Sequence, residues 1–186
     1  MRKKLAEFLL SLLGWSVESK LPDTKRFVVI GAPHTSNWDF PIGLLGMWAL
    51  DANFRWVGKH TLFTGPFKWL FTWLGGIPVD RRVHTGFIHR SAELLQESER
   101  MALCLAPEGT RSRTEYWKSG FYHIATEAGV PIALGYLDYS TKTLGVGAYF
   151  QPSGDIDADM EIIRKFYQGK VGKRPEQQGE VRLRPR

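Results

Sequence analysis

The sequence of 186 residues predicts a single α/β domain, in which a mixed β-sheet is flanked by helices and an amphipathic helix leads the chain. Short apolar runs alternate along the chain with longer segments of helical periodicity. The last two predicted strands are separated only by a turn-prone stretch. No internal repeat, low-complexity tract or linker composition divides the chain, so we expect one domain over residues 1–186.

The N-terminal segment, residues 1–18, predicts an amphipathic helix. Its apolar side chains share one helical stripe: Leu5, Phe8, Leu9, Leu12 and Leu13. The basic start resembles a signal peptide, but Glu7 interrupts the apolar stretch and no small-residue cleavage site follows. The stretch is also shorter than the roughly 20 residues that span a bilayer. The helix therefore either packs on the domain's own core or lies in a lipid interface.

Strands are predicted where β-branched or apolar residues form short runs. They are Arg26–Gly31, Phe54–Val57, Ile77–Val79, Met101–Leu105, Pro131–Leu137 and Leu144–Phe150. Helices are predicted over Asn37–Leu50, Leu62–Leu74 with an early break at Gly65-Pro66, Thr85–Ser98, Lys118–Ala128 and Asp155–Gln168. The helix from Asn37 must begin near that residue, because Pro41 is tolerated only in a first helical turn.

The positive charge of the chain is concentrated at its two ends. Residues 1–26 hold six Lys/Arg against three Asp/Glu, and residues 170–186 hold six against two, whereas the formal net charge of the whole chain is +6. Basic ends favour an anionic surface, either lipid headgroups or nucleic acid, but they are equally compatible with solvated ends. We expect the basic tail, residues 170–186, to be poorly ordered or to lie at an edge.

The single cysteine, Cys104, excludes an internal disulfide and any zinc site built from several cysteines. It lies in the apolar run of a predicted strand, where a small buried side chain is its expected role. A reducing compartment fits this composition. We expect a cytoplasmic protein that is peripheral on the cytoplasmic face of a membrane.

The stretch from Ala32 to Pro41 carries the first candidate chemistry. His34 lies in the loop after a predicted strand, and Asp39 lies in the first turn of the following helix. A chain reversal at the helix start lets the carboxylate reach the imidazole, which would fix its tautomer for general-base catalysis. The alternative is structural, with Asp39 only favouring the helix dipole and His34 serving as an ordinary loop histidine.

A second stretch, Pro107-Glu108-Gly109-Thr110-Arg111-Ser112-Arg113, follows another predicted strand. A glycine, two hydroxyls and two arginines form a plausible anion cradle, because arginine grips phosphate through two hydrogen bonds. The run Gly75–Arg82 also ends in arginines after a short strand. Both stretches lie where α/β proteins build their sites, although for either one taken alone a charged turn is the favoured interpretation.

Together these stretches resemble the glycerophospholipid acyltransferase family, which includes lysophosphatidic acid acyltransferases. The family's pattern of His, four residues and Asp is matched by His34 and Asp39, and its Pro-Glu-Gly-Thr-Arg-Ser block by Pro107–Ser112. Gly76–Arg81 approximates the block that ends in Asp-Arg, and Lys118 with Gly120 matches a following Lys-x-Gly. The Val-Pro-Ile block is present at residues 130–132, but its second proline is missing.

The resemblance implies a direct acyl transfer from acyl-CoA or acyl carrier protein to a hydroxyl of a lysophospholipid or glycerol-phosphate-like acceptor. His34 is then the general base and Asp39 orients it. The implied substrate-binding residues are Arg81, Glu108, Gly109, Thr110, Arg111 and Lys118. Neither a metal nor a cofactor is implied, and the partners are the thioester donor, a lipid acceptor and a membrane surface, with no nucleic acid.

Other functions are compatible with the same residues. A thioester hydrolase would use the same base to activate water, and the acceptor need not be a glycerophospholipid. A third alternative is a non-catalytic module that binds membranes through its basic ends. The aromatic segment Leu62–Leu74 either lines an acyl tunnel, faces lipid or belongs to the core.

Overall fold

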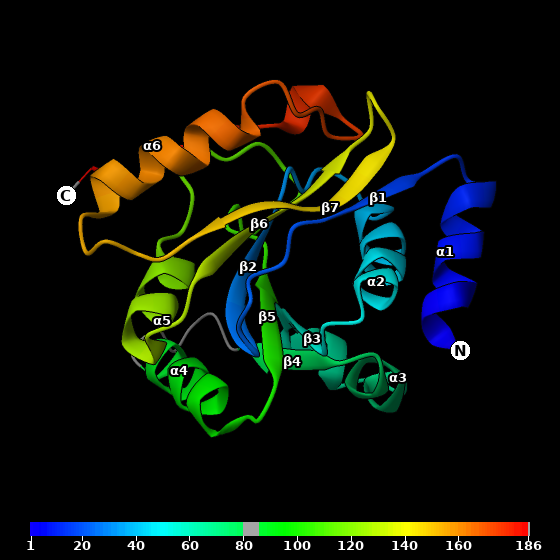
Figure 1. Cartoon of the computed structure of the whole chain (residues 1–186), viewed down its shortest axis with the longest axis horizontal. Helices are drawn as coiled ribbons and strands as arrows, with labels where there is room; N and C mark the ends of the chain where they lie inside the picture. The colour runs from blue at the N-terminus through cyan, green and yellow to red at the C-terminus, as the bar shows by residue number, and fades with distance from the viewer. Residues whose placement is uncertain (80–85, 186) are drawn as a thin grey trace.

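A seven-stranded mixed sheet runs through the centre of the molecule, as a computed structural model that describes residues 1–79 and 86–185 shows (Figure 1). Its strands lie in the order β1-β7-β6-β2-β5-β3-β4. They are β1 (Ser16–Ser19), β2 (Arg26–Ala32), β3 (Phe54–Lys59), β4 (Gly76–Val79), β5 (Met101–Leu105), β6 (Ile132–Asp138) and β7 (Thr143–Phe150). The pairs from β6 to β4 are parallel, whereas β7 is antiparallel to β6 and parallel to β1.

Helices cover both faces of this sheet (Figure 1). They are α1 (Arg2–Leu12), α2 (Asp39–Leu50), α3 (Lys68–Trp73), α4 (Phe87–Glu97), α5 (Gly120–Ala128) and α6 (Ile156–Tyr167), with short 3-10 turns η1 (His60–Phe63) and η2 (Pro175–Gln177). Helices α4, α5 and α6 pack on one face and α1 with α2 on the other. The predicted fold class, an α/β domain with a mixed sheet, flanking helices and an N-terminal helix, is confirmed.

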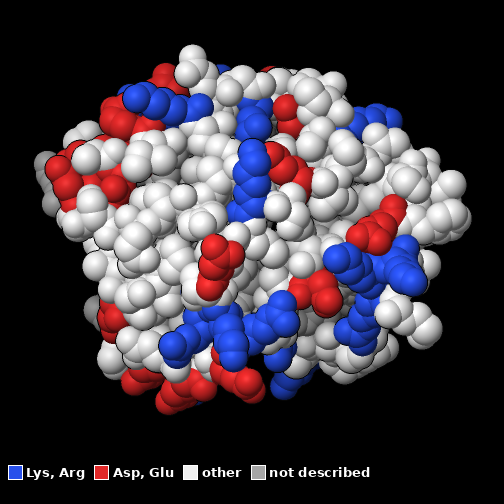
Figure 2. All heavy atoms as spheres, viewed as in Figure 1, with Lys and Arg blue, Asp and Glu red and all other residues white. Residues whose placement is uncertain are grey.

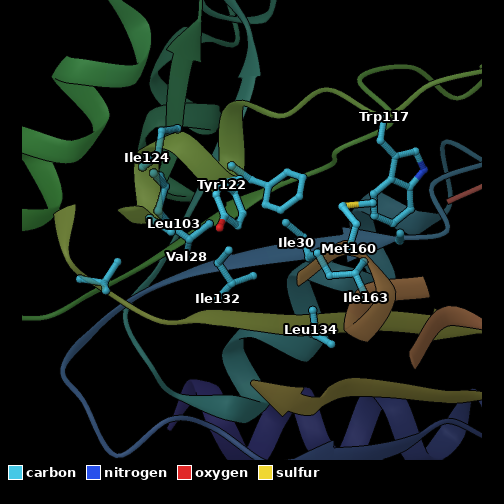
Figure 3. Packing of buried hydrophobic residues seen from close by; sticks show 14 of the residues in the cluster. Val28, Ile30, Leu103, Trp117, Tyr122, Ile124, Ile132, Leu134, Met160 and Ile163 are labelled. Atoms are coloured by element: carbon cyan, nitrogen blue, oxygen red, sulfur yellow. The ribbon is translucent and has the colours of Figure 1, made fainter. Parts of the chain in front are cut away.

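The central strand β2 shows why the sheet is covered on both sides. Successive strand side chains point to opposite faces, and in β2 both sets are apolar. Val28 and Ile30 join the large cluster under α5 and α6, with Figure 3 showing them beside Ile132 and Ile163. Phe27 and Val29 join a smaller cluster on the opposite face. Full burial of such side chains stabilises the fold by roughly 1.5–3 kcal/mol each.

The predicted strands and helices are all present in the described part of the chain, with shifted ends. The helix expected over residues 62–74 is divided into η1 and α3, and the division falls at the predicted Gly65-Pro66 break. Strand β1 was not predicted, because its sequence Ser-Val-Glu-Ser lacks an apolar run and its pairing partner β7 lies far away in sequence. Helix α4 covers Phe87–Glu97 of the predicted Thr85–Ser98, and Thr85 itself lies outside the described residues.

Helix α1 packs on α2 with a face different from its apolar stripe. The buried side chains of α1 are Ala6 and Leu10, both with no exposed surface. Four of the five stripe residues point outward, since Leu5, Phe8, Leu12 and Leu13 are 53%, 58%, 67% and 52% exposed, whereas Leu9 is half-buried. The helix therefore packs on the domain's own core, as one of the two expectations had it, but through Ala6 and Leu10 rather than through the predicted stripe.

The basic tail follows α6 back across the sheet and is held there by hydrogen bonds. Tyr139 N–H donates to Val171 O at 2.9 Å, and Trp117 N–H donates to Arg182 O at 2.8 Å. Leu183 also forms an isolated parallel bridge with Trp117. The tail thus lies along the edge formed by the carboxyl ends of the central strands, and the expectation of poor order is wrong for residues 170–185.

Strand β7 depends on a glycine where it passes between β1 and β6. Gly145 pairs with Glu18 on one side and Tyr136 on the other, and its φ is +141°. A Cβ built there would lie 1.9 Å from Glu18 O. No side chain fits that space, so the parallel β1–β7 pairing requires glycine.

We predict that Gly145→Ala lowers the free energy of unfolding by about 2–4 kcal/mol, because it combines an unfavourable φ with a backbone clash. Gly154→Ala is the matched control, since Gly154 also has a positive φ, +96°, but no atom lies within 4 Å of its built Cβ. Gly154→Ala should lower the free energy of unfolding by only about 1 kcal/mol. Urea unfolding of both variants decides the matter, and equal losses would contradict the clash.

Candidate active site

The loop from Pro33 to Trp38 leaves β2 and enters α2, and it brings the first two predicted residues together. His34 Nδ1 lies 3.3 Å from Asp39 Oδ2. The His34 side chain is 24% exposed, whereas that of Asp39 is 3% exposed. Both side chains line a cavity of about 1610 Å³. The chain reversal expected between them is therefore present, and it presents an imidazole to the cavity with a carboxylate behind it.

The carboxylate of Asp39 receives hydrogen bonds from several directions. The backbone N–H groups of Thr35 and Ser36 each donate to Oδ2 at 2.8 Å. The hydroxyl of Tyr139, which follows β6, donates to Oδ1 at 2.8 Å. These donors belong to the loop itself and to a segment 100 residues away. The side chain is thus locked in place at the start of α2.

These donors also set the charge of Asp39. Burial alone would raise its pKa, but the hydrogen bonds from His34, Ser36 and Tyr139 outweigh that effect and hold the pKa below its ordinary value. Asp39 is therefore ionised at neutral pH. An ionised carboxylate beside Nδ1 favours the tautomer in which Nδ1 carries the proton and Nε2 has a free lone pair.

Glu108 links the loop after β5 to the loop after β2. It is 4% exposed, and its Oε1 accepts a hydrogen bond from the backbone N–H of His34 at 2.9 Å. In the described part of the chain its Oε2 is buried without a hydrogen-bond partner. Burial, followed by the nearby charge of Asp39, raises the pKa of Glu108. The two carboxyl groups that contact His34 therefore have pKa values shifted in opposite directions, that of Asp39 downward and that of Glu108 upward.

The remaining predicted substrate-binding residues lie around the same cavity, with one exception. Gly109, Thr110, Arg111 and Lys118 all line it. Gly109 has a φ of +67°, and a Cβ there would lie 2.9 Å from Lys118 Cε, so glycine lets the lysine cross the loop closely. The exception is Arg81, which lies outside the residues that the structure describes.

The tail contributes contacts to this site that the sequence did not indicate. Arg174 N–H donates to the Thr35 hydroxyl at 3.1 Å. With its amide nitrogen turned toward two carbonyl oxygens, Gln177 donates to Thr35 O at 2.9 Å and to Arg111 O at 2.7 Å. The tail thus ties the two motif loops together. Tyr139 was also missed, although its place just after a strand of the sheet was a usable signal.

The aromatic segment around α3 is partly interior, partly on the cavity wall and partly exposed. Phe63 is 6% exposed and belongs to the interior, in ring contact with Trp56. Leu62 and Phe71 line the cavity. Three further rings point outward, with exposed fractions of 61%, 69% and 55%: Phe67, Trp69 and Trp73. The segment therefore forms part of the cavity wall and also a broad exposed aromatic surface.

Within residues 1–79 and 86–185, no three His, Cys, Asp or Glu side chains are grouped as the ligands of a metal ion. The same residues contain no helix with the length and hydropathy needed to cross a bilayer.

Comparison with known proteins gives a family and individual relatives. A family model described as Acyltransferase matches residues 16–133. The chain is 30% identical over 134 residues to the 1-acyl-sn-glycerol-3-phosphate acyltransferase of Haemophilus influenzae, covering 67% of this chain and 54% of that protein. It is 32% identical over 133 residues to the Escherichia coli protein of the same name, covering 67% and 53%. The chain thus spans about half the length of these curated relatives.

A solved structure matches the fold over most of the chain. It is the crystal structure of the 1-acyl-sn-glycerophosphate (LPA) acyltransferase PlsC from Thermotoga maritima, with a TM-score of 0.60 and 17% sequence identity. The match covers 93% of this chain and 79% of that one. At this level of identity the likeness concerns the fold alone.

Glu108 gives a prediction on the pH dependence of stability. Because its folded pKa is raised above 4.5, Glu108 ionises first in the unfolded chain as pH increases, and the contribution of this residue to stability falls from about pH 4.5 upward. Glu108→Gln removes that penalty. We expect the free energy of unfolding of the variant minus that of wild type to be larger at pH 7.5 than at pH 4.5. Denaturant titrations at the two pH values test this, and a difference that shrinks with rising pH would contradict it.

Proposed function

The chain belongs to the Acyltransferase family, and we propose that it transfers a fatty acyl group from a thioester donor to a hydroxyl of a lysophospholipid or glycerol-phosphate-like acceptor. The donor is acyl-CoA or acyl carrier protein. The observation that carries the proposal is the buried, ionised Asp39 behind a cavity-lining His34. The names of the two curated relatives, which give 1-acyl-sn-glycerol-3-phosphate as the substrate, support a phosphate-bearing acceptor.

The proposed reaction is a direct transfer. His34 Nε2 removes the proton of the acceptor hydroxyl as its oxygen attacks the thioester carbonyl carbon. The C–O bond forms, the carbonyl electrons move to oxygen, and the collapse of this tetrahedral species breaks the C–S bond. The leaving thiolate takes the proton from the imidazolium, so the products are an ester and a free thiol. Asp39 stabilises the imidazolium and keeps the ring oriented.

The polar part of the cavity suits an acceptor that carries a phosphate. Arg111 and Lys118 both line it, and arginine binds phosphate through two parallel hydrogen bonds. Arg81, which we propose as a further phosphate ligand, lies outside the described residues. The buried Oε2 of Glu108, which has no hydrogen-bond partner among the described residues, supports a role in accepting a hydrogen bond from an acceptor hydroxyl, because an orphaned buried oxygen is costly.

The apolar part of the cavity suits an acyl chain. Its walls include Phe40 and Met47 from α2, Leu62 from η1 and Phe71 from α3. Phe40 packs edge-on against Trp56, with ring centroids 4.7 Å apart. Apolar contacts of this kind bind a hydrocarbon chain by removing its surface from water.

We further propose that α1 and α3 hold the enzyme on the cytoplasmic face of a membrane as a peripheral protein. The outward stripe of α1 and the outward rings of α3 are adjacent, because the Arg2 guanidinium lies 4.7 Å from the Trp73 ring centre. Seen as in Figure 1, the edge formed by α1 carries a group of Lys and Arg side chains, with acidic side chains and uncharged surface beside it (Figure 2). Apolar and aromatic side chains beside basic ones suit an anionic lipid interface.

The central test is the removal of the base. We expect His34→Ala to lower acyl transfer to lysophosphatidic acid by at least about 10³-fold, and Asp39→Asn by about 10²-fold or more. Each change breaks the pair formed by His34 and Asp39. Both should retain the wild-type circular dichroism spectrum. The assay measures esterified product and free fatty acid separately, so that hydrolysis is distinguished from transfer.

The matched control for that test is His89→Ala. His89 also has carboxylate neighbours, Glu93 and Glu127, but its side chain is 68% exposed on α4 and outside the cavity. Its removal should leave turnover unchanged. Turnover retained in His34→Ala would overturn the mechanism, and free acid as the main product of wild type with acceptor present would favour the hydrolase.

The membrane proposal predicts that replacing Leu5, Phe8 and Leu12 together by serine weakens binding to phosphatidylglycerol vesicles at least about tenfold. Each replacement removes an exposed apolar side chain that would otherwise enter the interface. Vesicle sedimentation measures the bound fraction. The control replaces two exposed apolar residues elsewhere, Tyr149 and Ile162, by serine and should bind like wild type. Equal losses of vesicle binding in both variants would contradict the proposal that the α1 surface binds the membrane.

A further inference from the structure

Among the residues that the structure describes, Tyr139 is the one side chain that reaches the Asp39 carboxylate from outside the motif loops. It follows β6 in the chain, and its hydroxyl donates to Asp39 Oδ1 at 2.8 Å. The other oxygen, Oδ2, faces His34 Nδ1 and the two backbone N–H groups of the loop. The two carboxylate oxygens are thus assigned to different sets of partners. Tyr139 lies behind Asp39 and is not part of the cavity wall.

We propose that Tyr139 is a positioning residue of the acyl transfer, which fixes the rotation of the Asp39 carboxylate so that Oδ2 stays directed at His34. The inference rests on the proposed function of His34 as the base. The terminal torsion of an aspartate is broad, so donors on one oxygen alone leave the carboxylate plane free to tilt. A donor on the opposite oxygen removes that freedom.

Tyr139 is itself restrained, as a positioning residue must be. Its ring packs edge-on against Trp15, with centroids 4.9 Å apart, and its backbone N–H donates to Val171 O at 2.9 Å. The Lys173 ammonium lies 5.7 Å from the ring centre. The connection after α1 and the tail after α6 therefore hold the phenol from two sides. Burial, followed by the charge of Asp39, raises the pKa of the Tyr139 hydroxyl, which stays protonated and can only donate to the carboxylate.

This arrangement predicts an effect on the chemical step rather than on substrate binding. During the reaction His34 becomes positively charged, and the energy of that ion depends on where the Asp39 charge lies. Because Tyr139 touches Asp39 and not the cavity, its loss should alter the imidazolium and leave the substrate contacts in place. A merely structural tyrosine would instead alter stability and both substrate affinities together.

The test is Tyr139→Phe, which removes one hydroxyl and keeps the ring packed against Trp15. We expect kcat for transfer to lysophosphatidic acid to fall about tenfold, with KM for donor and acceptor within about twofold of wild type, because a hydrogen bond to a charged group is lost. Tyr139→4-aminophenylalanine keeps an N–H donor toward Asp39 and should restore kcat to within about threefold of wild type.

The matched control is Tyr122→Phe. Tyr122 donates to the buried Asp159 at the same distance, 2.8 Å, but the pair joins α5 to α6 on the other side of the sheet. This variant should melt at a lower temperature and keep the wild-type kcat. A Tyr139→Phe enzyme with unchanged kcat, or with KM altered as much as kcat, would overturn the inference while His34→Ala remained inactive. Retained turnover in His34→Ala would instead overturn the proposed function.

Discussion

The whole site depends on the stabilisation of one buried negative charge, the carboxylate of Asp39. Moving an isolated carboxylate out of water is very costly, so a side chain that is 3% exposed must be surrounded by donors or become neutral. Here two backbone N–H groups, a phenol and an imidazole surround it. Because these donors have to converge on one point, the charge dictates the shape of the loop after β2 and its contact with the segment after β6.

The parallel part of the sheet makes this convergence possible. Strands β2, β5 and β6 are neighbours and run in the same direction, so the segments after them meet at one edge. The first carries His34, the second carries Glu108 and the third carries Tyr139. Glu108 holds the first segment by its backbone, and Gln177 from the tail ties it to the second. A base, an orienting acid and a polar cavity wall thus come from separate parts of the chain.

The predictability of these features follows from the distance along the chain between partners. His34 and Asp39 were identified because they lie in one short loop, where a proline fixes the helix start. Tyr139 was not, because its hydrogen bond to Asp39 spans 100 residues, and its place just after a strand does not say which side chain it meets. The α1 stripe was recognised by its periodicity, but periodicity does not say which face meets a neighbour, and Ala6 with Leu10 proved to be the docking face. The tail looked unstructured because its order comes from distant partners rather than from apolar runs.

The most direct test of this account is the tautomer of His34, read from its ring nitrogen shifts by ¹⁵N NMR on histidine-labelled protein at about pH 8, above the ordinary pKa of histidine. The His34→Gln spectrum supplies the assignment. We expect Nδ1 to carry the proton, directed at Asp39, and Nε2 to show the shift of an unprotonated ring nitrogen. A proton on Nε2, with Nδ1 bare beside the carboxylate, would contradict the role assigned to this pair.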